Sequence, residues 1–152
     1  MMNLELPEII LNILLADDDL DDRFFFDKAL KEIPVSTKLI TVNNGEQLMN
    51  YLYENLQNLP DILFLDLSMP RKTGFECLSE IKENNNLKTL QVIMFTTSYT
   101  RSADLEQNLK STLLKMGARE YIRKPNEIEE LKNIIHQTLL RTIEHKELRD
   151  KK

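Results

Sequence analysis

Short apolar runs alternate with longer amphipathic segments along this chain, and no other feature restricts its fold as strongly. The runs are apolar or β-branched almost throughout and end in polar residues; they cover 13–16, 38–42, 62–65, 92–95 and 121–122. Near-continuous runs of this length are typical of strands that are buried on both faces, as in a parallel sheet. Parallel neighbours cannot be joined by a tight hairpin, so the segments between the runs are expected to form helices.

Those intervening segments carry helical signals; the expected helices cover 21–33, 44–56, 73–81, 105–116 and 126–139. Asn44 precedes Gln47 by three residues, a spacing that caps helix N-termini. Thr73 and Glu76 repeat this spacing, and Gly117 is a typical helix stop. Five strand–helix units with right-handed crossovers predict a three-layer, doubly wound α/β domain with a parallel five-stranded sheet.

Apolar residues at helical spacing also predict which helical side chains face the core. In the first helix these include Phe25 and Phe26. In the fourth helix the stripe runs through Leu105, Leu109 and Leu113. Such stripes normally pack against a sheet.

Length and charge limit the function classes. A chain of 152 residues suits a single domain, which we expect over 1–152, with a core from about 12 to about 140 and a charged, fraying tail over 144–152. The net charge of −5 disfavours a nucleic-acid partner. The lone Cys77 excludes an intramolecular disulfide and agrees with a reducing compartment. No apolar run reaches the roughly 18 residues that span a bilayer, so we expect a cytoplasmic protein without a membrane partner.

Chemically distinctive residues follow four of the five runs: Asp17-Asp18-Asp19, Asp66, Thr96-Thr97 and Lys124-Pro125. In doubly wound sheets, ligands bind at the carboxyl ends of the strands, so these side chains are expected to meet in one pocket. Gathered carboxylates repel one another unless a cation compensates them. A lysine and a hard divalent cation would both do so, and oxygen ligands favour Mg²⁺. An aspartate beside Mg²⁺ can attack phosphorus and form an acyl phosphate.

In this order and at these strand ends, the motifs resemble the receiver domain of bacterial two-component response regulators. The motifs are 13–18, 61–70 with Gly74, 92–97 and 121–125. The resemblance extends from about Asn12 to about Leu140, which is nearly the whole chain. It implies a flavodoxin-like domain with strand order 2-1-3-4-5.

The resemblance also implies a phosphoacceptor and a metal site. Asp66 would be the phosphoacceptor and would contact Mg²⁺. Asp18 would bind the metal directly, and Asp17 would assist, through water. The backbone carbonyl of Ser68 would complete the protein ligands.

Three further residues match positions that act on or after phosphorylation in this family. Lys124 would pair with the phosphoryl group. Thr96 would be the switch hydroxyl that moves toward it. Tyr121 would be the aromatic residue whose side chain turns inward in the active state.

The implied function is that of a stand-alone receiver, a signalling protein rather than an enzyme. It would take a phosphoryl group from a sensor histidine kinase or a histidine phosphotransfer protein and lose it by slow autodephosphorylation. The face formed by the fourth helix, fifth strand and fifth helix would then act on an unidentified downstream protein. The same face could hold a homodimer together.

One segment departs from the common family pattern, and alternative functions stay open. The chain between Tyr99 and Met116 is longer than usual, as in single-domain, chemotaxis-regulator-like receivers that resemble those paired with bacteriophytochrome kinases. The alternatives are a phosphorylation-independent scaffold with this fold and a Mg²⁺-dependent aspartyl phosphohydrolase. Ser68 disfavours the hydrolase, since such enzymes commonly carry a second aspartate there. A flavin or nucleotide binder is disfavoured because the chain lacks a glycine-rich phosphate loop.

Overall fold

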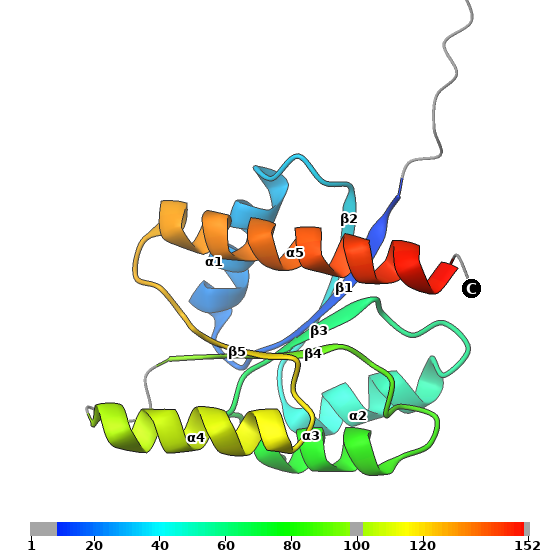
Figure 1. The fold of residues 1–152 in the computed structure, drawn as a ribbon, viewed down its shortest axis with the longest axis vertical. Helices are drawn as coiled ribbons and strands as arrows, with labels where there is room; N and C mark the ends of the chain where they lie inside the picture. The colour runs from blue at the N-terminus through cyan, green and yellow to red at the C-terminus, as the bar shows by residue number, and fades with distance from the viewer. Residues whose placement is uncertain (1–8, 98–101, 151–152) are drawn as a thin grey trace, which may run out of the picture.

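The computed structural model describes residues 9–97 and 102–150, in which five strands and five helices alternate (Figure 1). The elements are β1 (Leu11–Ala16), α1 (Leu20–Lys31), β2 (Thr37–Val42), α2 (Gly45–Glu54), β3 (Ile62–Leu65), α3 (Gly74–Glu83), β4 (Val92–Thr96), α4 (Ala103–Lys115), β5 (Glu120–Arg123) and α5 (Ile128–Asp150). All strand pairs are parallel, and the order is β2-β1-β3-β4-β5. The predicted flavodoxin-like topology is therefore confirmed.

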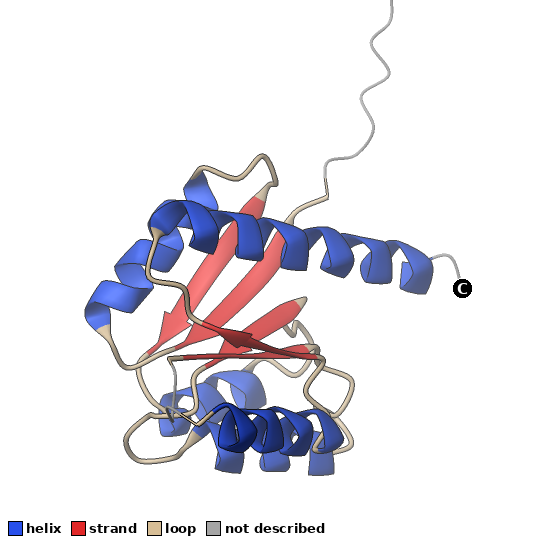
Figure 2. Cartoon of the chain, turned by 60° about the vertical axis from the view of Figure 1, so that its left-hand side comes forward, coloured by secondary structure: helices blue, strands red, loops and turns tan. Residues whose placement is uncertain are grey.

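The sheet lies between two helical layers, with α1 and α5 on one face and α2, α3 and α4 on the other (Figure 2). Successive residues of each central strand point to opposite faces. Ile13 and Leu15 of β1 therefore join the apolar cluster under α1 and α5, whereas Leu14 and Ala16 join the cluster under the other helices. Burial on both faces explains why the strands appear in the sequence as unbroken apolar runs.

The predicted capping residues occupy the helix ends in the structure. The Thr73 hydroxyl accepts a hydrogen bond from the backbone N–H of Glu76, whose carboxylate accepts one from the backbone of Thr73. The Asn44 side chain accepts from the backbone N–H of Gln47. Gly117, after α4, has a φ of +111°, a conformation that side chains disfavour. These contacts set where α2 and α3 begin and how α4 ends.

Two apolar stripes pack less completely than the helical spacing predicts. Phe26 and Leu113 are buried, but Phe25 of α1 is 47% exposed and Leu105 of α4 is 59% exposed. Leu109 is partly buried. Each helix presents only a narrow strip to the sheet, and side chains at the margins of the stripe stay in solvent.

The charged segment from residue 144, expected as a tail, continues α5 as a helix to Asp150. Lys146 pairs with Asp61 at 3.1 Å, and the other carboxylate oxygen of Asp61 accepts a hydrogen bond from the backbone N–H of Asn12 at 2.8 Å. The last turns of α5 thus contact the amino ends of the interior strands β1 and β3. Among the described residues, no helix combines the length and apolar character needed to cross a bilayer.

Candidate functional site

The carboxyl ends of the strands bring together Asp17 from β1, Asp66 from β3, Thr96 from β4 and Lys124 from β5. Backbone hydrogen bonds continue just past the strands and set these positions. The N–H of Asp66 donates to the carbonyl of Ala16 at 3.0 Å, and the N–H of Lys124 donates to the carbonyl of Thr96 at 2.8 Å. The side chains of Asp66 and Lys124 therefore extend from backbone that is hydrogen-bonded to the neighbouring strand.

Asp66 lies at the centre of this group and is almost fully buried, with 6% of its surface exposed. The Thr96 hydroxyl donates to its Oδ1 at 2.9 Å. The Lys124 ammonium approaches Oδ2 at 3.5 Å. Ser68 is exposed, and its backbone N–H reaches Oδ1 at 3.4 Å. Both carboxylate oxygens thus face groups that stabilise negative charge.

Three carboxylates form a candidate cation site. Asp17, Asp18 and Asp66 each offer an oxygen, and these oxygens lie within 4.8 Å of one another. Asp17 and Asp66 are buried, whereas Asp18 is exposed toward solvent. An open cluster with only oxygen ligands fits a hard divalent ion of the Mg²⁺ or Mn²⁺ type, because such ions keep several waters.

The electrostatics of the site centre on the pair of Asp17 and Lys124, whose Oδ2 and Nζ atoms lie 2.6 Å apart. Burial raises the pKa of Asp17 to about 6, although Lys124 and the backbone N–H of Asp19 oppose this shift. Burial lowers the pKa of Lys124, but its hydrogen bonds and charge interactions with Asp17, Asp66 and Asp22 outweigh burial and raise it. Lys124 therefore stays protonated and bridges the three carboxylates of Asp17, Asp22 and Asp66.

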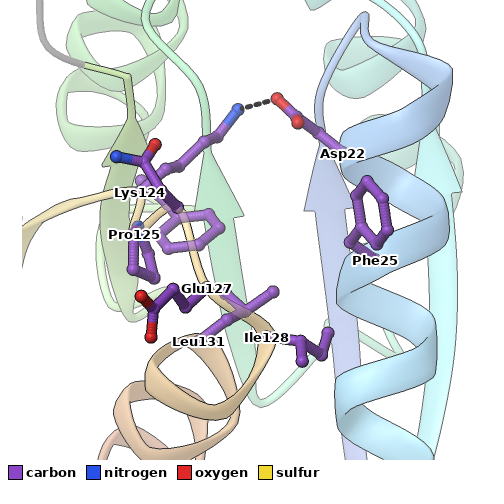
Figure 3. Close-up of a pocket in the computed structure, with 9 residues that line it drawn as sticks. Asp22, Phe25, Lys124, Pro125, Glu127, Ile128 and Leu131 are labelled. Carbon is purple, nitrogen blue, oxygen red and sulfur yellow. Dashed lines mark hydrogen bonds and ion pairs between the residues drawn. The ribbon is translucent and has the colours of Figure 1, made fainter.

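Sequence reasoning missed two members of this group, both in the first turns of α1. Asp22 Oδ2 lies 2.9 Å from the Lys124 ammonium. Figure 3 marks this ion pair with a dashed line. The Arg23 guanidinium donates to the backbone carbonyl of Asp17 at 2.7 Å. The available signal was the short β1–α1 connection, which returns the first helical turn to the carboxyl end of the sheet.

A cleft of about 120 Å³ adjoins Lys124, between α1 and the start of α5 (Figure 3). Its apolar lining consists of Phe25, Phe95, Pro125, Ile128 and Leu131. The Lys124 ammonium lies 5.8 Å from the centre of the Phe95 ring. An apolar cleft therefore lies directly beside the polar site, with Lys124 lining both.

Tyr121 lies on β5 and packs partly against the core on the α4 side of the sheet. Its hydroxyl is buried and has no hydrogen-bond partner among the described residues. Burial raises the pKa of this phenol. A hollow bordered by α4 and β5 residues, among them Gln107 and Arg123, lies beside it. Tyr99, at the start of the extended segment, lies outside the described residues.

Comparison with known proteins agrees with this geometry. The family model of the response regulator receiver domain matches residues 13–136. The response regulator Rcp1 of Synechocystis is 37% identical over 92 residues, which cover 57% of this chain and 62% of Rcp1. The two-component response regulator ARR17 of Arabidopsis thaliana is 31% identical over 134 residues, which cover 80% of this chain and 82% of ARR17.

Solved structures show the same fold. The Mn²⁺-bound form of Rcp1 superimposes with a TM-score of 0.70 at 27% identity, over 84% of this chain and 90% of Rcp1. The phosphorylated cyanobacterial phytochrome response regulator RcpA gives a TM-score of 0.73 at 28% identity, over 86% of this chain and 91% of RcpA. These likenesses bear out the expected resemblance to phytochrome-associated regulators. Because the family model matches residues 13–136, which include the strand ends that form the site, this chain belongs to the response regulator receiver domain family of two-component signalling.

Proposed function

We propose that this chain accepts a phosphoryl group on Asp66 from a sensor histidine kinase or a histidine phosphotransfer protein. One observation carries the proposal: Asp66 is buried at the end of β3, with the Thr96 hydroxyl and the Lys124 ammonium directed at its two oxygens. A buried carboxylate is costly unless it is paired with a cation and hydrogen-bonded, as Asp66 is here. This carboxylate lies beside an acidic cluster that suits a divalent cation.

The transfer forms one bond and breaks one. An Asp66 oxygen attacks phosphorus and forms an acyl phosphate, while the bond from phosphorus to the donor's histidine nitrogen breaks and the nitrogen keeps the electron pair. Lys124 would pair with the transferred group, and Thr96 would exchange its present bond to Asp66 for one to a phosphoryl oxygen. These groups stabilise charge where it develops in the transition state.

Mg²⁺ is the proposed cofactor. Asp18 and Asp66 would bind it directly, Asp17 would act through water, and the Ser68 carbonyl would add a neutral oxygen. When bound, the ion supplies positive charge that offsets the phosphoryl oxygens. The Mn²⁺-bound form of Rcp1 supports a divalent ion in this family.

The proposed output is a change on the face formed by α4, β5 and α5. Once Thr96 moves toward the phosphoryl group, it vacates space near β5 into which Tyr121 could turn. The buried Tyr121 hydroxyl, which has no hydrogen-bond partner within 9–97 and 102–150, and the neighbouring hollow support this movement. The face would then engage a downstream protein or a second copy of the chain, and slow autodephosphorylation would reset it.

The test is incubation with Mg²⁺ and acetyl phosphate, followed by intact mass measurement. We expect a gain of one phosphoryl group that disappears in Asp66→Asn and after metal chelation. A protein that binds Mg²⁺ but gains no mass would contradict the proposal and favour a scaffold that uses the fold without phosphorylation. Sustained turnover of a phosphate ester would instead favour the aspartyl phosphohydrolase.

A further inference from the structure

Asp22 makes a contact that the proposed chemistry does not use. Its Oδ2 lies 2.9 Å from the ammonium of Lys124, across the mouth of the cleft between α1 and α5 (Figure 3). We infer that Asp22 is a positioning residue that competes with Asp66 for this ammonium and so limits the rate of phosphorylation. The inference rests on the proposed function.

The distances show how the Lys124 ammonium shares its hydrogen bonds among three carboxylates. Lys124 Nζ lies 2.6 Å from Asp17, 2.9 Å from Asp22 and 3.5 Å from Asp66. An ammonium has three hydrogen-bond donors, and these three carboxylates take all of them. The phosphoacceptor receives the longest of the three contacts. In this structure the cation is thus held toward Asp17 and Asp22 and away from Asp66.

Backbone contacts hold both partners of the Asp22 pair in place. The N–H of Asp22 donates to the side chain of Asp19, which caps α1. The backbone N–H of Lys124 is bonded to Thr96. The Lys124 side chain is only 8% exposed and that of Asp22 is 36% exposed. The pair is therefore less screened by water than an ordinary surface ion pair.

Phosphorylation requires this arrangement to change. The transferred group adds negative charge next to Asp66, and Lys124 must turn one of its donors toward that group. Asp22 holds one donor back and adds a negative charge near the path of an anionic phosphodonor. Removing its charge while keeping its shape should release the ammonium toward Asp66 and speed the transfer.

The chain offers a matched control for the change in net charge. Asp21 lies exposed in the same first turn of α1, so Asp21→Asn removes the same charge from nearly the same place. A general charge effect changes the donor concentration needed for half-maximal rate. An effect through Lys124 changes the maximal rate itself. Asp22→Glu retains the charge and serves as the conservative rescue.

The experiment measures the phosphorylation rate of the full chain against acetyl phosphate concentration at saturating Mg²⁺, with folding checked by urea unfolding. We expect Asp22→Asn to raise the maximal rate about two- to fivefold, Asp21→Asn to leave it unchanged, and Asp22→Glu to return it toward the wild-type value. In a Lys124→Met background, adding Asp22→Asn should change nothing further. A folded Asp22→Asn protein with a maximal rate no higher than that of Asp21→Asn would overturn the inference. A wild-type protein that gains no phosphoryl group would refute the proposed function itself, and the inference with it.

Discussion

Lys124 and Asp17 form an ion pair of 2.6 Å although they are 107 residues apart in the chain and lie at the ends of strands that are not neighbours. β3 and β4 separate β1 from β5, so the lysine side chain spans two strand ends to reach Asp17. Its Nζ atom also lies 3.5 Å from Oδ2 of Asp66. Lys124 thus contacts both buried carboxylates of the site, Asp17 and Asp66.

Loss of that cation should destabilise the protein in the absence of metal. Lys124→Met leaves buried carboxylates without their partner, and we expect the free energy of unfolding to fall by about 3 kcal/mol. Mg²⁺ should restore part of the loss, because it neutralises the same carboxylates. Urea unfolding with and without Mg²⁺ measures both effects. Lys132→Met, which removes only half-exposed ion pairs, should cost less than about 1 kcal/mol and serves as the control.

Metal affinity should depend on pH through Asp17. Its pKa is raised to about 6, so the carboxylate is mostly ionised above that pH and increasingly protonated below it. Protons and metal then compete, and we expect the affinity for Mg²⁺ to fall about tenfold between pH 7 and pH 5. Calorimetric titration across this range tests the expectation. Asp17→Asn should bind more weakly at pH 7 and lose most of the dependence on pH; an unchanged slope in that variant would contradict the assignment.

The hydrogen bond from Thr96 to Asp66 should contribute measurably to stability. Thr96→Val keeps the shape but removes the donor from a buried carboxylate, which we expect to cost about 2 kcal/mol. Thr96→Ser keeps the hydroxyl and should cost less. Thr97→Val, at the exposed neighbouring position, should change stability by less than about 0.5 kcal/mol. Thermal or urea unfolding compares the three variants, and equal losses at both positions would count against the bond.

Arg71 provides a test of backbone strain in the loop between β3 and α3, which follows Asp66. It follows Pro70 with a φ of +69°, and its guanidinium makes an exposed 3.6 Å pair with Glu46. The left-handed conformation destabilises a non-glycine residue by about 1 to 2 kcal/mol. Substitution by glycine removes this cost, but part of the gain is lost because glycine raises the conformational entropy of the unfolded chain. We expect Arg71→Gly to stabilise the protein by about 0.5 to 1 kcal/mol, whereas Arg71→Ala should not stabilise it. If the two variants unfold alike, the strain is absent.

Much of the fold followed from features that act locally or through simple periodicity. Burial on both sheet faces produces unbroken apolar runs, and helix caps depend on pairs three residues apart, such as Thr73 with Glu76. The convergence of Asp17, Asp66 and Lys124 followed from strand ends, since parallel strands place their carboxyl ends at one edge. The resemblance to receiver domains rested on the same residues.

Other properties were decided only by the tertiary structure. Whether Phe25 is buried depends on how α1 is rotated against the sheet, and spacing alone left it in the predicted core. The last turns of α5 contact Asp61 through Lys146, which lies 85 residues away in the chain. The contact of Asp22 with Lys124 depends on side chains that meet across the site from α1 and β5. Each of these properties depends on packing and charge between segments that are distant in the chain. The amino-acid sequence contains those segments but shows no local sign of how they meet.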